Sequence, residues 1–449
     1  MIGDIDKHFR NVGSIRRRWT VCLRRMILMM GILPWVMGCW ATAADWPTYM
    51  RDAQRSGITS ESLSTNLGLA WVYPRVKHPH PAWQDEAKRD YSVDIPSQRP
   101  FKQRNLFDRV NHVAVSGGKV FLGSSTDHTL QSLDAVTGEP KWTFFTEGPV
   151  RMAPTVDSGR VYAGSDDGSA YCLDAERGTL IWKHTPAGST NYYVPNNGQP
   201  VSPWAVRSGV LVDRGIAYFA AGLFPSEGVY VCAVDALTGQ LTSTNHWRTR
   251  HVNQGSMQGY LLLSNTRVYV PGGRSNPFYF NRSNGALAGQ YNDREASGTF
   301  ALLAGNSVFF GRSGRTVGHI TESGTGGDVL ATYDDGNAMV VTTNRSFLLS
   351  ETTLSALARP GRASLWTKPV ASGQALILAG STLWVGREGE VAAYDAVTGN
   401  RLWVGSVSGR ALGLAVSEGR LLVSTDQGLI YSFAARPGPG QPQSALMLR

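Results

Sequence analysis

Polar side chains recur at one fixed position along the chain, directly before a series of apolar strand–turn–strand pieces. When the pieces are aligned, these positions are Arg109, Arg151, Arg207, Gln258, Asn337, Gln374 and Arg410. Several guanidinium groups that converge on one pocket would make a bidentate site for a carboxylate or a phosphate. They would also repel one another unless acids compensate their charge, so the alternative is that each arginine pairs with an acid on a neighbouring loop. The sequence therefore offers a candidate ligand site or a set of structural ion pairs.

Two other groups of residues have the right chemistry for metals but the wrong spacing. His78 and His80 flank a proline, and no cysteine or close acid completes a ligand set with His112, so solvated loop histidines are expected. Asp166-Asp167-Gly168 resembles part of a calcium loop but lacks the remaining ligands, and a hairpin turn is expected there. We assign no metal ligand and no catalytic residue from the sequence.

The cysteines also limit the chemistry. Beyond residue 44 only Cys172 and Cys232 remain, and two thiols make neither a disulfide framework nor a zinc site by themselves. No Cys-x-x-Cys-His segment is present for covalent haem attachment. We expect both side chains to be buried free thiols.

A unit built around an aspartate, a glycine and a tryptophan is repeated along the chain. The unit has eleven residues, and its strongest copies carry Asp at the third position, Gly at the seventh and Trp at the eleventh, with a strand before the unit. The aspartate suits a turn because it accepts backbone N–H bonds, the glycine closes a hairpin with positive φ, and the tryptophan is large enough to fill the wedge between neighbouring sheets. The residues of the repeat are Asp134, Gly138, Trp142, Asp174, Gly178, Trp182, Asp235, Gly239, Asp395, Gly399 and Trp403.

The repeat predicts an all-β, eight-bladed β-propeller of four-stranded antiparallel blades. Eight strand–turn–strand pieces begin near Val113, Met152, Ser208, Gly259, Thr299, Ala338, Gln374 and Ala411. The 326 residues from 110 to 435 give about 41 per blade, which is in the propeller range. The last piece has only three strands, so we expect residues 69–73 to close the ring beside residues 429–434. Residues 299–366 lack the Asp-x-x-x-Gly turn, which leaves strand pairing there undefined.

Composition agrees with many short strands. The chain has 449 residues with 50 Gly, 13 Trp and 17% charged residues, which excludes a charge-rich disordered chain and disfavours a helical bundle. The net charge is +9, but +5 of it lies in residues 1–44. A nucleic-acid partner is therefore not indicated.

The N-terminal residues resemble an export signal. Seven Lys or Arg precede an apolar stretch, Met26–Gly38, and a small-x-small site, Ala41-Thr42-Ala43, follows it. We expect residues 1–44 to be a signal peptide and the protein to be periplasmic or envelope-located, with no transmembrane span after its removal. A lipid anchor at Cys39, and an uncleaved leader, are the alternatives. Residues 45–435 would form the propeller with a strap at 75–109, and residues 436–449 a disordered tail.

The eleven-residue unit resembles the tryptophan-docking repeat of PQQ-type, or quinoprotein alcohol dehydrogenase-like, β-propellers. The segment from Asp45 to Gly57 is similar to the entry segment of the same group, and Gly222–Gly228 resembles exported repeat proteins of the planctomycete kind. This resemblance covers about residues 46–435. It includes PQQ-dependent alcohol dehydrogenases and also the BamB-type scaffold of outer-membrane assembly. The chain departs from the dehydrogenases because it has no vicinal Cys-Cys pair and no segment that matches their catalytic aspartate or metal set.

The resemblance implies an exported binding or scaffold protein of the cell envelope. Its expected partner is an envelope protein, or a small anionic or sugar-like ligand at the channel mouth, and a monomer is expected. No cofactor is predicted. The alternative is a PQQ-dependent oxidoreductase of alcohols or sugars that would need PQQ and calcium, and a hydrolase or lyase is a third reading. The repeat defines the fold far better than the function.

Overall fold

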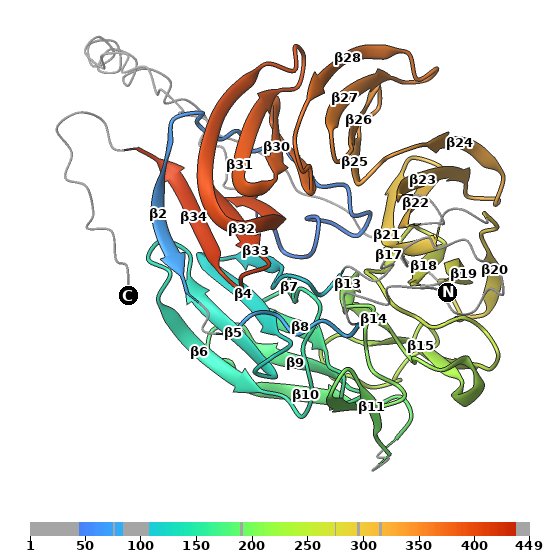
Figure 1. The fold of residues 1–449 in the computed structure, drawn as a ribbon. Coiled ribbons are helices and arrows are strands. Elements are labelled where there is room, and N and C mark those ends of the chain that lie inside the picture. The colour runs from blue at the N-terminus through green and yellow to red at the C-terminus, as the bar shows by residue number, and fades with distance from the viewer. Residues whose placement is uncertain are drawn as a thin grey trace, which may run out of the picture. The chain divides into compact units, whose positions relative to one another are not determined.

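The computed structural model describes residues 45–74, 77–83, 107–188, 192–273, 275–293, 297–313 and 317–436. These described residues belong to one compact unit, whose sheets follow one another around a common centre in Figure 1. The predicted signal peptide with Cys39, most of the strap and the tail from residue 437 lie outside the described residues. The boundaries of the predicted domains therefore stay predictions.

Most of the described chain forms four-stranded antiparallel sheets. Six such sheets are present among the described residues, and in each the strands are hydrogen-bonded in chain order. Their strands are β3 (Val113–Ser116), β4 (Lys119–Ser124), β5 (Thr129–Asp134) and β6 (Pro140–Phe145); β7 (Thr155–Asp157), β8 (Arg160–Gly164), β9 (Ala170–Asp174) and β10 (Leu180–His184); β13 (Leu211–Asp213), β14 (Ile216–Ala221), β15 (Val229–Asp235) and β16 (Trp247–His251); β17 (Leu262–Leu263), β18 (Arg267–Gly272), β19 (Ser275–Asn281) and β20 (Leu287–Gln290); β21 (Ser297–Ala304), β22 (Ser307–Ser313), β23 (Val317–Gly324) and β24 (Val329–Tyr333); β25 (Ala338–Val341), β26 (Arg345–Leu349), β27 (Thr353–Ala358) and β28 (Ser364–Pro369).

A further sheet of eight strands completes the ring. The long strand β32 pairs with β31 through its first part and with β33 through its last part, so it serves two successive four-stranded arrays. The strands in order are β1 (Ile58–Thr59), β29 (Ala375–Ala379), β30 (Thr382–Gly386), β31 (Glu388–Asp395), β32 (Arg401–Ser417), β33 (Arg420–Thr425), β34 (Ile430–Ala435) and β2 (Leu67–Tyr73). A separate hairpin, β11 (Val194–Asn196) and β12 (Gln199–Val201), lies between two of these sheets. A short 3-10 helix, η1 (Pro225–Glu227), lies in the loop between β14 and β15.

The predicted closure of the ring is confirmed. Strand β2 pairs antiparallel with β34, with Leu69 opposite Phe433 and Trp71 opposite Ser432. Each of the predicted strand–turn–strand pieces corresponds to the first two strands of one four-stranded array, including the region 299–366 whose pairing the sequence left undefined. There the alternating apolar residues of β21–β28 form two complete sheets without the Asp-x-x-x-Gly turn.

The repeat tryptophans join neighbouring sheets. Trp142 on β6 donates through Nε1 to the carbonyl of Ala175 at 3.0 Å, in the turn of the next sheet. Its ring covers Gly178, where an added Cβ would come within 2.5 Å of the ring and where φ is +68°, so only glycine fits. The same contact recurs where Trp71 meets Gly138, Trp182 meets Gly239, Trp247 meets Gly285 and Trp366 meets Gly399. Trp403 instead donates to the carbonyl of Leu67 on β2, at 3.1 Å.

The aspartates of the repeat stabilise the same turns. The Oδ1 atom of Asp134 accepts the backbone N–H groups of Val136 and Thr137, both at 2.9 Å. Asp174, Asp235 and Asp395 accept the equivalent pairs of N–H groups. Partial burial by itself would raise the pKa of Asp134, but these bonds and the ion pair with Lys141 together outweigh it and lower the pKa to about 2.

The segment before β2 covers one end of the ring's interior. Trp46 bridges to Val115 on β3, and the backbone oxygens of Ala53 and Gln54 accept N–H bonds from Leu263 at 3.0 Å and Leu303 at 2.8 Å. Further along, β1 pairs parallel with β29. All these partners lie on or near the ends of innermost strands, so residues 46–59 run across that end. The opposite end, where the innermost strands begin, holds the predicted polar positions.

Candidate functional site

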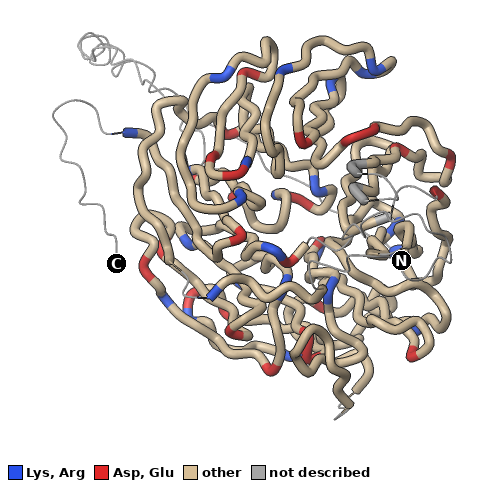
Figure 2. The backbone as a smooth tube through the Cα atoms, viewed as in Figure 1, with Lys and Arg blue, Asp and Glu red and all other residues tan. Residues whose placement is uncertain are grey.

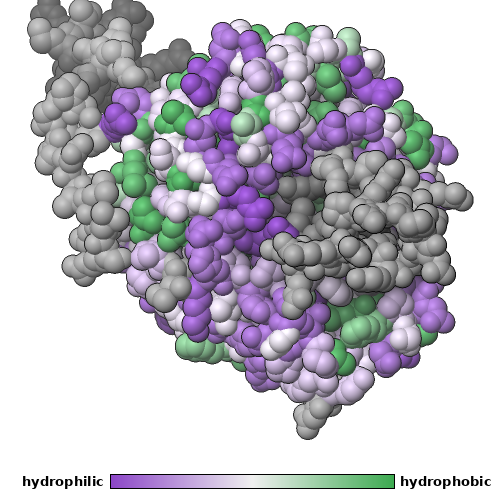
Figure 3. All heavy atoms as spheres, in the orientation of Figure 1, coloured by the Kyte–Doolittle hydropathy of each residue, from purple (hydrophilic) through white to green (hydrophobic). Residues whose placement is uncertain are grey.

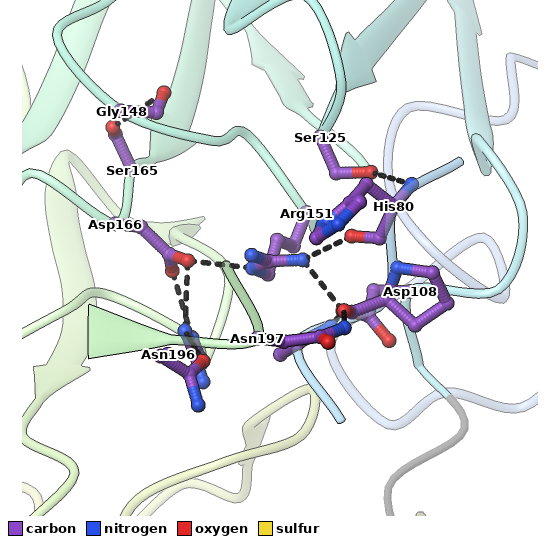
Figure 4. A network of polar contacts seen from close by, with 12 residues as sticks. His80, Asp108, Ser125, Gly148, Arg151, Ser165, Asp166, Asn196 and Asn197 are labelled. Carbon is purple, nitrogen blue, oxygen red and sulfur yellow. Dashed lines mark hydrogen bonds and ion pairs between the residues drawn. The ribbon is translucent and has the colours of Figure 1, made fainter. Parts of the chain in front are cut away.

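The candidate site is a buried charged cluster at the end where the innermost strands begin. Arg151 precedes β7 and Arg207 precedes β13, and Asp166 stands in the loop between β8 and β9. The Nε atom of Arg151 donates to Asp166 Oδ2 at 2.6 Å, and Arg207 binds both oxygens of the same carboxylate at 2.8 Å. Figure 4 shows this arrangement, in which one aspartate joins two sheets. All three side chains are at most 1% exposed.

Described parts of the predicted strap contact this cluster. Arg151 Nη1 donates to Asp108 Oδ2 at 3.0 Å and to the carbonyl of His80 at 2.5 Å. The backbone N–H of Ala82 donates to the same oxygen of Asp108 at 2.6 Å. Trp83 Nε1 donates to Gln258 Oε1 at 3.1 Å. Residues 77–83 therefore lie over the loops that precede β7 and β17.

The hairpin β11–β12 adds two further contacts. Arg207 Nη2 donates to Asn196 Oδ1 at 2.8 Å, and Asn197 Nδ2 donates to the carbonyl of Pro81 at 2.7 Å. Because neither hairpin nor strap belongs to the repeat, they are additions to the propeller that meet over the cluster.

Charge is balanced within the cluster, since two guanidinium groups face two carboxylates. Burial alone would raise the pKa of Asp166, but the charges of Arg151 and Arg207 outweigh it and hold the pKa below its usual range. The same pairing outweighs burial for Arg151 and raises its pKa. Asp166 is therefore ionised, and both Arg151 and Arg207 form ion pairs with it.

Gln258 forms a β-bridge with Arg207, whereas Arg410 and Asn337 make their described contacts outside the cluster. Arg410 pairs with Asp426 at 2.7 Å, and its side chain is 38% exposed. Asn337 Nδ2 donates to the carbonyl of Gly373 at 3.1 Å, and the backbone N–H of Gln374 donates to the carbonyl of Gly386 at 2.9 Å. Arg109 is the neighbour of Asp108 in the chain.

Sequence reasoning missed two residues of the site, Asp108 and Asn196. It named Asp166 but did not predict that Asp166 pairs with the two arginines. One signal could have predicted this pairing, because Asp166 follows Arg151 by 15 residues and Asp426 follows Arg410 by 16, each in an ion pair. Asp108 and Asn196 come from segments with no repeat pattern, so no spacing points to them.

Three aromatic side chains pack against one another beside the innermost strands. The rings of Tyr49 and Tyr260 stack with centroids 3.7 Å apart and an angle of 7°, and His112 meets Tyr49 edge-on at 4.9 Å. Beside them Arg55 is buried and donates to the carbonyl of Leu261 at 3.0 Å, and burial lowers its pKa to about 10. These residues come from the entry segment and from the segments before β3 and β17, so they lie inside the ring.

The remaining candidate groups have structural surroundings. Cys172 and Cys232 are buried free thiols, as predicted, and burial raises the pKa of Cys172 to about 12. His78 is exposed, and its carbonyl accepts a bond from Thr126 at 2.6 Å. Among the described residues no group of three or more His, Cys, Asp or Glu is placed to hold a metal ion. In that part of the chain no helix is long and apolar enough to cross a membrane.

This architecture defines a β-propeller, and the predicted all-β fold class is confirmed. Residues 82–329 and 350–439 match a family model described as outer membrane protein assembly factor BamB, and the chain belongs to that family. The recognition of PQQ-type and BamB-like repeats in the sequence is therefore confirmed as well.

Similar proteins fall on both sides of the functional question. A quinone-dependent alcohol dehydrogenase subunit of Gluconobacter oxydans is 31% identical over 129 residues, which is 25% of this chain and only 16% of that protein. The quinohemoprotein alcohol dehydrogenase of Comamonas testosteroni has a TM-score of 0.61 at 15% identity, covering 90% of this chain and 82% of the other. BamB of Moraxella catarrhalis has a TM-score of 0.54 at 13% identity, covering 74% and 97%. The two structural likenesses show the fold alone.

Two features of the described residues bear on whether a quinone and its calcium ion could be held inside the ring. The Tyr49 and Tyr260 rings contact each other directly, so no third planar ring fits between them. Both oxygens of Asp166 accept hydrogen bonds from Arg151 and Arg207, so this carboxylate is not free to hold a calcium ion.

Proposed function

We propose that this protein acts by binding, as an exported scaffold of the cell envelope that holds another envelope protein. The observation that carries this proposal is the bonding within the charged cluster. Its acids form ion pairs with its arginines, and Arg151 also donates a hydrogen bond to the strap. A general base or nucleophile needs a free group with an adjusted pKa, whereas Asp166 is held ionised by two arginines. The family description, which names an outer membrane assembly factor, supports the same reading.

The outer strands supply surface for a protein partner. Phe145 at the end of β6 is 73% exposed, and Val404 on β32 is 46% exposed. The visible face in Figure 3 is a mosaic of hydrophilic and hydrophobic residues, and acidic and basic residues are interspersed along the chain in Figure 2. Such mixed surfaces are typical of non-obligate protein interfaces.

We propose a periplasmic or envelope location and a monomeric protein, with a small anionic or sugar-like ligand as the alternative to a protein partner.

A second candidate function is a quinoprotein oxidoreductase, favoured by the stretch that resembles the Gluconobacter dehydrogenase subunit. Incubation with PQQ and calcium, followed by dialysis and absorption spectroscopy, separates the two functions. A stoichiometric quinone band with dye-linked oxidation of alcohols or sugars would overturn the binding proposal.

Cross-linking in the cell tests the scaffold directly. The tagged protein should yield one recurrent envelope protein in near-stoichiometric amount, and Phe145→Asp or Val404→Asp should reduce its recovery if these strands form the interface. Val136→Asp provides a matched control, because Val136 is also exposed, at 58%, but lies in a turn at the end of the ring. Equal loss in all three variants, or no recurrent partner, would contradict the proposal.

A further inference from the structure

The two carboxylates of the charged cluster are used very differently. Asp166 accepts three hydrogen bonds from guanidinium groups through both of its oxygens. Asp108 accepts two bonds, from Arg151 and from the backbone of Ala82, and both go to Oδ2. Its Oδ1 is buried and has no hydrogen-bond partner among the described residues. Asp166 is therefore a saturated part of the propeller, whereas Asp108 is an incomplete acceptor.

Unused donors remain in the same cluster. Arg151 Nη2 and Arg207 Nη1 are buried and also lack a partner among the described residues. Both guanidinium groups bind the same oxygen of Asp166, at 2.6 and 2.8 Å, which places them side by side. Buried polar groups are almost always hydrogen-bonded, and charged ones lose the most when they are not. Two buried donors and one buried acceptor in the cluster therefore lack partners. This indicates that Asp108 does not satisfy the hydrogen-bonding groups of the two arginines as well as another acceptor could.

Charge counting points to the kind of occupant. Without Asp108 the cluster would hold two guanidinium groups and one carboxylate, with a net charge of +1. Asp108 comes from outside the repeat, from a segment that contributes no strand to the sheets among the described residues. An oxyanion with two or three acceptor oxygens would satisfy more donors than the single oxygen that Asp108 uses.

We propose that Asp108 stands in for the oxyanion of a ligand, and that Arg151 and Arg207 form a binding site for a carboxylate or phosphate group. Asp108 then competes with the ligand and sets its affinity. This inference rests on the proposed binding function and names the chemistry recognised at the strap end of the ring. Its test uses purified protein and added anions, so its failure leaves the cross-linking result for a protein partner untouched.

The experiment measures binding of inorganic phosphate and of acetate, each alone, to the full chain by calorimetry and by the shift of the melting temperature. Sodium chloride of equal ionic strength controls for screening. We expect the wild type to bind at least one probe and Asp108→Asn to bind it about tenfold or more tightly, because the competing charge is gone. The asparagine side chain keeps an oxygen for the Ala82 N–H, so this variant should fold where Asp108→Ala does not.

The controls decide between a site and a general charge effect. Asp426→Asn frees the partly exposed Arg410 and should leave affinity for both probes unchanged, and Arg151→Gln should abolish binding. A response to phosphate alone assigns a phosphorylated ligand, and a response to acetate assigns a carboxylate-bearing one. The proposal is overturned if the wild type responds to neither probe, or if Asp108→Asn binds no more tightly than the wild type. Asp108 would then be a permanent structural counter-ion.

Discussion

Replacing Asp166 by asparagine tests whether the charged cluster holds the two sheets together. The substitution keeps the shape of the side chain but removes the charge that faces Arg151 and Arg207. Three charge-assisted hydrogen bonds of 2.6 to 2.8 Å are affected. Each such bond contributes about 1.5–3 kcal/mol to the free energy of unfolding, but the side-chain oxygen of the asparagine can still accept some of these bonds. Breaking a buried ion pair by removing one partner costs about 3–5 kcal/mol, which is the loss of unfolding free energy that we expect.

The matched control is Asp426→Asn, which removes the equivalent acid beside Arg410. That arginine is 38% exposed, so water can replace the lost partner and the cost should be at most about 1 kcal/mol. Urea unfolding followed by circular dichroism measures both variants, with the slope m compared to verify that the unfolding transition is unchanged in kind. Equal costs for the two variants, within about 0.5 kcal/mol, would refute the reasoning that burial makes the Asp166 cluster different.

Three further predictions concern the repeat and the thiols. Titration followed by NMR should give Asp134 a pKa of about 2, and because that value is depressed, its stabilising effect is present above about pH 4 and disappears as the pH falls toward 2. A midpoint near 4 would contradict the role of its turn bonds. Trp71→Ala should cost about 3–5 kcal/mol in urea unfolding because it removes the packing and the bond to Ala135 that close the ring, whereas Phe145→Ala, at an exposed site, should change stability by less than about 0.5 kcal/mol. The thiol of Cys172, with a pKa of about 12, should resist alkylation at pH 8 until the protein unfolds, and rapid labelling of the native protein would show that it is accessible.

The fold could be predicted from the sequence because its determinants are local and repeated. An aspartate, a glycine and a tryptophan at fixed spacing define a hairpin and its contact with the next sheet, as Trp142 and Gly178 show. Even the long-range pairing of β2 with β34 followed from counting, because one unit lacked a strand and Trp71 supplied the missing tryptophan.

The site was only half predictable, and the reason is physical. Arg151 and Arg207 occur at equivalent repeat positions and could be aligned, but their surroundings depend on chain segments that obey no period. Asp108 lies 43 residues before Arg151 and reaches it only because residues 77–83 and 107–109 fold back over the ring. Such contacts follow from tertiary packing, and neither composition nor periodicity records them.

The difference between two equivalent ion pairs shows where function can be added to a repeat fold. Arg151 with Asp166 and Arg410 with Asp426 occupy the same places in their sheets and use the same Nε contact, at 2.6 and 2.7 Å. One pair is 1% exposed, and the arginine of the other is 38% exposed, because described strap residues contact the first pair. Since the propeller supplies the same pair twice, what separates the two is the added segment that covers one of them. Recognition by this protein is therefore expected where strap and β11–β12 hairpin meet the ring, and variants of these additions should alter binding while the repeat keeps the fold.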